Sequence, residues 1–268
     1  MSRSAWQSEW VTEELARALA FEEALRERCA ERVVPFAFGR AFFNDTFAAV
    51  WDLNHLLVER PEGATAEVLA AEAEQLHSEA GQTHRRVVVP HEEAGSALDA
   101  GFADLGWDAH RFLYMAYRGE GSRRGEADRA DEVEAAAVWP IHEAVSRAEP
   151  WASEEVVVQT VLGGTRLAAE RGGARHFAVR AAGEVVSAAD LYVAGGVAQV
   201  EDVVTSPDHR GRGHASAVVA RAIEAALAGG AELVFLVADD VDWPKDLYAR
   251  LGFEPIGRTW AFQLSAGA

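Results

Sequence analysis

The chain has 268 residues, of which 49% are hydrophobic and 25% are charged, and its formal net charge is −18. This length predicts two domains rather than one compact core, and the composition is that of a globular protein. The acidity disfavours nucleic acid as a partner, and the single cysteine, Cys29, excludes an intramolecular disulfide and a cysteine-rich metal site. No membrane span and no apolar signal core occurs, so we expect a cytoplasmic protein with no membrane partner.

The first half predicts alternating helices and strands. An amphipathic helix is expected over residues 12–32, where Thr12 can cap its N-terminus. Residues 33–59, rich in Phe and Val and broken by turn residues, fit two or three strands. The elements expected next, in chain order, are a helix over 65–79, a strand over 86–89, a helix over 92–105 and a strand over 112–117.

A segment without core-forming side chains follows. Residues 118–131 contain three glycines and no aliphatic side chain larger than alanine. Such a segment cannot bury a core, so it predicts a linker. We therefore expect a first domain over residues 1–118, a linker over 119–130 and a second domain over 131–268.

The second half predicts an antiparallel meander between helices. Its expected elements are helices over 131–146 and 153–170, strands over 175–180, 184–193 and 197–205, a helix over 215–228, a strand over 233–237, a helix over 244–251, and a last strand over 259–264. The turns at Ala182-Gly183 and Gly195-Gly196 suit hairpins between the three consecutive strands.

The two halves resemble each other at a constant offset of 146 residues. Phe102-Ala-Asp-Leu-Gly-Trp107 mirrors Tyr248-Ala-Arg-Leu-Gly-Phe253, and the same offset superimposes the preceding strands and helices without a gap. We interpret this as a duplication. Opposite the second half's Arg-Gly-Arg-Gly-His-Ala, the first half has Ala-Thr-Ala-Glu-Val-Leu, which predicts that the first half keeps its core and has lost an anion site.

The segment Glu201–Ala215 carries the chemistry. It is predicted to run from a strand through a glycine-rich loop into a helix, whose first N–H groups and dipole favour a bound anion. Arg210 and Arg212 add positive charge, and Gly211 and Gly213 allow close approach to the backbone. The pattern suits a pyrophosphate.

Three other kinds of loop share features with this segment. The Walker pattern requires a lysine that is absent, and in the dinucleotide fingerprint the third glycine is replaced by Ser216. The dinucleotide fold also begins with a parallel strand, whereas an antiparallel meander is expected here. A plain basic turn that caps a helix remains the simplest alternative.

Two motifs together resemble those of the GNAT superfamily of acyl-CoA-dependent N-acyltransferases. Arg210, Gly213 and Ala215 match its Arg/Gln-x-x-Gly-x-Gly/Ala signature, and Leu247–Glu254 matches its second landmark. The resemblance implies an α/β fold of two tandem GNAT-type domains, each a mixed and mostly antiparallel sheet flanked by helices. The chain departs from the family pattern at Thr205-Ser206, before the proline, and at Val241, where asparagine is common.

The resemblance also implies roles for individual residues. Acetyl-CoA is the implied acyl donor: Val203, Val204 and Thr205 would offer backbone groups to its pantetheine arm, and Arg210, Gly211, Arg212, Gly213, His214 and Ala215 would hold its pyrophosphate. Tyr248 corresponds to the general acid that protonates the departing thiolate.

The base that accepts the amine proton is less defined by the sequence. Glu201 is our candidate, and Gln199 shares its face by the period of two; Asp190, Asp202 and His176 are alternatives. His209 and His214 are expected to flank the phosphates. Trp151 and Trp243 are candidates for lining the acceptor cleft, and no spacing of His, Cys or Asp indicates a metal site.

The sequence thus predicts an N-acetyltransferase that transfers an acetyl group from acetyl-CoA to a primary amine of a small molecule or peptide. The active site is expected in the second half. The alternative is a catalytically silent acyl-CoA-binding module that acts as a sensor or in assembly. The acceptor and the oligomeric state, a homodimer included, stay open.

Overall fold

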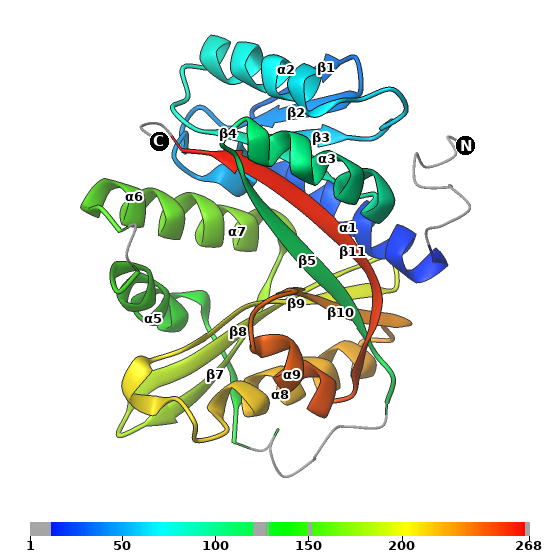
Figure 1. The fold of residues 1–268 in the computed structure, drawn as a ribbon. Coiled ribbons are helices and arrows are strands. Elements are labelled where there is room, and N and C mark those ends of the chain that lie inside the picture. The colour runs from blue at the N-terminus through cyan, green and yellow to red at the C-terminus, as the bar shows by residue number, and fades with distance from the viewer. Residues whose placement is uncertain (1–11, 120–126, 128, 150–151, 266–268) are drawn as a thin grey trace. The chain divides into compact units, whose positions relative to one another are not determined.

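The structure is a computed structural model that describes residues 12–119, 127, 129–149 and 152–265. The chain divides into two compact units (Figure 1). Unit 1 comprises Met1–Tyr114, Ala238–Asp242 and Ile256–Ala268, and unit 2 comprises Met115–Val237 and Trp243–Pro255. Each unit therefore includes residues from both sides of the predicted linker.

Unit 1 is a mixed sheet flanked by three helices. Its strands are β1 (Arg32–Phe36), β2 (Gly39–Phe43), β3 (His55–Val58), β4 (Arg85–Val89), β11 (Phe253–Leu264) and β5 (Asp108–Tyr117), in that spatial order. β3 and β4 are parallel, whereas β1–β2, β2–β3 and β4–β11 are antiparallel. The helices are α1 (Glu13–Cys29), α2 (Ala66–Glu79) and α3 (Glu92–Asp104), with a short 3-10 turn η1 (Trp51–Leu53).

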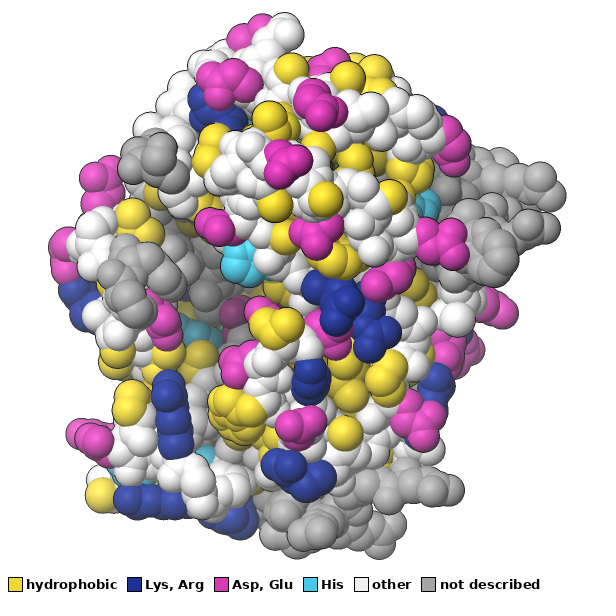
Figure 2. Space-filling view, in the orientation of Figure 1, with side chains coloured by type: hydrophobic (Ala, Val, Ile, Leu, Met, Phe, Trp, Pro, Cys, Tyr) yellow, Lys and Arg dark blue, Asp and Glu magenta, His cyan; other side chains and the backbone are white. Residues whose placement is uncertain are grey.

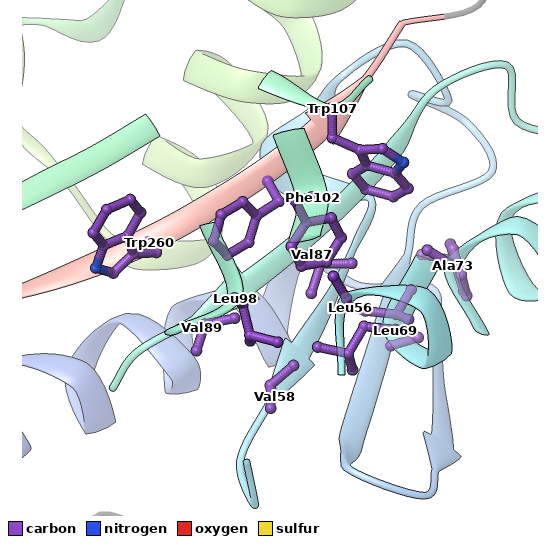
Figure 3. Packing of buried hydrophobic residues seen from close by; sticks show 14 residues of the cluster. Leu56, Val58, Leu69, Ala73, Val87, Val89, Leu98, Phe102, Trp107 and Trp260 are labelled. Atoms are coloured by element: carbon purple, nitrogen blue, oxygen red, sulfur yellow. The ribbon is translucent and has the colours of Figure 1, made fainter. Parts of the chain in front are cut away.

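The C-terminal strand β11 belongs to the sheet of unit 1. It lies between β4 and β5, and Trp260 and Phe262 face Val89 and Val87 in its register with β4. Figure 3 shows that the core cluster of this unit combines residues of β3, β4, α2 and α3 with Trp260 of β11. The segment 259–264 is thus a strand as predicted, but it completes the sheet of the first half, because its aromatic side chains bury against α3.

Unit 2 contains the predicted meander. Its strands, in spatial order, are β10 (Leu233–Asp239), β9 (Val197–Thr205), β8 (Glu184–Ala194), β7 (Arg175–Ala181) and β6 (Asp131–Val133); β9 and β10 are parallel and the other pairs antiparallel. The helices are α5 (Ala135–Arg147), α6 (Glu154–Gln159), the π-helical segment η2 (Thr160–Leu167), α7 (Ala168–Gly172), α8 (His214–Ala228) and α9 (Pro244–Arg250), and a 3-10 turn η3 spans Pro207–His209.

Helices α5 and α8 cover opposite faces of the meander. Val138 and Ile141 of α5 cluster with Ala178 and Ala188. Arg221 of α8 lies 5.8 Å from the ring centroid of Phe177, the neighbour of Ala178 on β7. Because successive strand residues point to opposite faces, α5 and α8 lie on different sides of the sheet.

The structure extends the duplication beyond the elements that the sequence aligned. With the offset of 146 residues, the bounds of α2 become 212–225 and α8 spans His214–Ala228; β5 becomes 254–263 and β11 spans Phe253–Leu264. When shifted by the same offset, the bounds of β1 overlap those of β7, the bounds of β2 overlap those of β8, and the bounds of α1 overlap the run from α6 to α7. Both units are mixed, mostly antiparallel sheets flanked by helices, so the predicted fold class is confirmed.

Two predicted helices of the second half differ in detail. Residues 131–133 form β6, because they pair with β7 and Glu132 forms an ion pair with Arg175, so the helix begins only at Ala135. The helix predicted over 153–170 is interrupted by η2, and such π-helical insertions occur frequently at functional sites.

The acidic side chains form no single continuous patch on the face shown in Figure 2, where they are interspersed with basic side chains. Among the described residues, no helix is long and apolar enough to cross a membrane.

Candidate active site

Strand β9 leaves its parallel neighbour β10 halfway along its length. The pairing covers only Val197–Gln199 and Leu233–Phe235, whereas β9 continues to Thr205 and β10 to Asp239. On its other edge β9 still pairs with β8 as far as Thr205. The second half of β9 therefore has an edge that no longer pairs with β10, and an extended ligand arm could add to it as a strand does.

A β-bulge lies in this same half of β9. Val204 faces Ala188 and Glu201 faces Asp190, so two residues of β9, Asp202 and Val203, oppose a single residue of β8. Asp202 has φ +52°, in the left-handed region that a non-glycine residue rarely adopts. The bulge re-aims the backbone of residues 202–204, and backbone strain of this kind concentrates at functional sites.

Helix α8 begins where β9 and the turn η3 end. Its N-cap is Gly213, with φ +76°, and Gly211 has φ +73°. Both positions require the left-handed backbone that glycine adopts without strain. No side chain caps α8, so the N–H groups of its first turn point toward the loop with no intrahelical partner. This is the geometry of an anion site.

Three arginines surround this loop. The Arg210 Nε donates to the Thr205 carbonyl oxygen at 3.3 Å, and Arg212 Nη2 donates to the Asp208 carbonyl oxygen at 2.9 Å. Arg129 Nη2 donates to the Arg212 carbonyl oxygen at 3.3 Å and lies 3.2 Å from His214 Nδ1. Burial and the charges of Arg129 and Arg212, together with His209, lower the pKa of His214, so this helix start lies in a positive field.

Sequence reasoning missed Arg129. Arg129 falls within the predicted linker, which was identified only by its lack of core-forming side chains. Its proximity to Gly213 depends on how the chain enters β6, which no local pattern reveals: a Cβ at Gly213 would lie 3.3 Å from the Arg129 guanidinium.

The corresponding helix start of the first half is already occupied. The Thr65 side chain caps α2 and accepts the N–H of Val68. A bond from its own backbone N–H and one from Thr65 lower the pKa of the exposed Glu67 carboxyl. Thr65 and Glu67 stand where Gly211 and Gly213 stand in the second half, and a carboxylate there repels an anion.

Tyr248 and Glu201 both belong to unit 2, and the charge of Glu201 acts on Tyr248. The Tyr248 side chain on α9 is 8% exposed and packs at 6.3 Å against Phe253. Burial, and secondarily the negative charge of Glu201, raise the pKa of Tyr248. The phenol therefore stays protonated at neutral pH. Glu201 accepts a hydrogen bond from the Gln199 amide at 2.7 Å, so the predicted shared face of these two residues is present.

The other predicted residues divide between two places. Val203, Val204 and Thr205 lie in the half of β9 that does not pair with β10. His209 and His214 flank the glycine loop, with ring centroids 6.3 Å apart. Asp190 and His176 pair with each other on β8 and β7. Trp243 is 62% exposed, and Trp151 lies outside the described residues. Within the described part of the chain, no group of three or more His, Cys, Asp or Glu side chains could hold a metal ion.

Comparison with protein families gives one match, to the Acetyltransferase (GNAT) family over residues 138–253. This segment begins in α5 and ends at the first residue of β11, so it contains the bulge, the glycine loop and Tyr248. A search of curated proteins found no match.

Solved structures match over both halves. A functionally unknown conserved protein from Staphylococcus epidermidis has a TM-score of 0.68 at 12% identity, covering 88% of this chain and 94% of its own. A GCN5-related N-acetyltransferase from Kribbella flavida has 0.61 at 20% identity, covering 96% of each chain. A tandem GNAT protein from the clavulanic acid biosynthesis pathway has 0.51 at 21%, covering 75% of this chain and 70% of its own.

At these identities the structural matches establish the fold, and the family profile locates its signature in the second half. The C-terminal half of the chain matches the GNAT acetyltransferase family over residues 138–253, and the chain as a whole has the fold of solved tandem GNAT proteins.

Proposed function

We propose that the chain transfers an acetyl group from acetyl-CoA to a primary amine. One observation supports this most strongly: a strand edge without a neighbour, a bulge and an uncapped helix start follow one another within residues 200–216. The first suits the amide groups of a pantetheine arm, the second suits a polarised carbonyl oxygen, and the third suits a pyrophosphate.

The reaction assigns each residue one role. Backbone N–H groups near Val203 and Val204 polarise the thioester carbonyl, and Glu201 takes a proton from the attacking amine. The nitrogen–carbon bond forms and the carbon–sulfur bond breaks, while Tyr248 donates its phenolic proton to the departing sulfur. The products are the N-acetylated amine and CoA with a free thiol.

Tyr248→Phe tests this assignment, because it removes the hydroxyl and keeps the ring. We expect kcat for CoA release to fall at least tenfold, since general acids contribute roughly 10²–10⁴-fold, with the affinity for acetyl-CoA unchanged. Tyr117→Phe is the matched control: its ring packs on the same Phe253, at 5.6 Å, and we expect normal turnover.

Two results would contradict the proposal. Unchanged turnover in Tyr248→Phe would remove this residue from the mechanism. Acetyl-CoA binding without CoA release across a panel of primary amines would instead favour the silent acyl-CoA-binding module.

A further inference from the structure

A buried polar cluster lies beside the proposed base, on the face of the meander that α5 covers. Asp190 on β8 is fully buried, and its Oδ1 lies 2.7 Å from Nδ1 of His176 on β7. His142 on α5 is 4% exposed, and the Trp139 ring packs 5.3 Å from the His176 ring and 6.3 Å from the His142 ring. The charge of Asp190 raises the pKa of His142, against the larger lowering by burial, and His176 also acts on it. His142, His176 and Asp190 are therefore neighbours.

Two polar atoms of this cluster have no hydrogen-bond partner among the described residues: Asp190 Oδ2 and His142 Nε2. Buried polar atoms in native proteins almost always have a partner, and an unpaired carboxylate oxygen is especially costly. Burial is the main influence on His142, and it lowers the pKa of its imidazole. A neutral imidazole with its proton on Nδ1 presents Nε2 as an acceptor. In that tautomer His142 Nε2 and Asp190 Oδ2 offer two buried acceptors to one donor group.

The register places this cluster next to the reacting centre. His176, Asp190 and Glu201 are successive partners across β7, β8 and β9, so they lie in one row on one face of the sheet. Neighbouring strands are about 4.8 Å apart. Asp190 therefore lies one strand beyond Glu201, so a short acceptor whose attacking nitrogen lies at Glu201 can place its other end at Asp190.

We propose that Asp190 Oδ2 and His142 Nε2 bind a second ammonium group of the acceptor, so that the substrate is a short diamine acylated at its other end. An ammonium has three N–H donors and no acceptor, which matches a carboxylate oxygen and an imidazole nitrogen. His176 holds Asp190 in position. This inference rests on the proposed function and specifies its acceptor class.

The test compares two amines of similar length on the full chain with saturating acetyl-CoA. We expect kcat/KM for 1,4-diaminobutane to exceed that for butylamine at least tenfold. Asp190→Asn keeps an oxygen for His176 and removes the charge, so it should abolish the preference while leaving acetyl-CoA affinity within twofold. Glu184→Gln, an exposed carboxylate on the same strand, is the control and should keep the preference. Equal kcat/KM values for the two amines, or a preference that persists in Asp190→Asn, would overturn the proposal.

A second measurement needs neither turnover nor a variant of Asp190. In the wild-type chain, 1,4-diaminobutane should shift the imidazole NMR signals of His142 and His176, assigned through His142→Asn and His176→Asn, and 1,4-butanediol should not. Absence of a shift with the diamine overturns the proposal even if other amines are acetylated. A shift without any CoA release supports the subsite and contradicts the proposed function instead.

Discussion

Two histidines of unit 1 are buried in a state that requires them to be neutral. His77 Nδ1 lies 3.0 Å from Gln82 Oε1, and the Arg86 N–H points to His77 Nε2 at 3.4 Å, which fits the tautomer with its proton on Nδ1. His84 Nε2 donates to the Asn54 carbonyl oxygen at 3.1 Å. Burial is the main influence on both rings, and it lowers the pKa of each to about 4, from 6.5.

These shifts predict acid lability of the fold. Between pH 6.5 and 4 the unfolded chain binds more protons at His77 and His84 than the folded chain, so the free energy of unfolding falls as the pH falls. Each imidazole should contribute a loss of roughly 2 kcal/mol between pH 7 and pH 5. Urea unfolding of wild type and of His84→Gln at both pH values measures this. The variant should lose less stability on acidification than the wild type; equal losses would contradict the assignment.

Single residues also show where sequence reasoning stops. The glycine loop and Tyr248 were recognisable because each is a local pattern that depends on residue type. The bulge at Asp202 was not, since it arises from the register between β8 and β9. The cluster of His142, His176 and Asp190 could not be predicted from the sequence either. Its members come from α5, β7 and β8 and come together only when the sheet forms.

At the scale of elements, local periodicity predicted nearly every helix and strand, and the exceptions have physical causes. β6 is only three residues long and is stabilised by pairing with β7. Its own sequence is too short to show the alternation that predicts a strand. The placement of β11 could not be foreseen either. Its aromatic pattern predicts a strand. Its position between β4 and β5 depends on the packing of Trp260 and Phe262 against α3, which the pattern does not reveal.

Removing one side chain of β11 should therefore destabilise the sheet of the first half. Phe262 is fully buried and its ring lies 4.2 Å from that of Phe102 on α3. We expect Phe262→Ala to lower the free energy of unfolding by about 3–5 kcal/mol. Chemical denaturation measures it, with Leu264→Ala, at the partly buried end of the same strand, as the milder control. A cost for Phe262→Ala no greater than that of the control would refute the role of β11 in this core.

At the scale of the whole molecule, we interpret the chain as a duplication: the elements from α1 to β5 recur in the same order from α6 to β11, whereas the residues at the start of the two matching helices differ. Phe102 replaces Tyr248, and the capped start of α2 replaces the open start of α8. Residues 1–118 lack β11, a strand of the sheet of unit 1, so the ligand affinity of isolated halves would not represent that of the intact chain. We propose that all affinity for acetyl-CoA lies in the second half, at the glycine loop and Arg129, and that the first half binds none; the full chain is the protein in which to test this.

The most direct measurement is a calorimetric titration of the full chain with acetyl-CoA, for wild type and for Gly213→Glu. This substitution gives α8 the carboxylate that Glu67 supplies in the first half, and it strains the backbone at φ +76°. We predict one acetyl-CoA per chain for the wild type and no measurable binding for the variant. Binding that survives in Gly213→Glu, or a second equivalent per chain, would contradict the account.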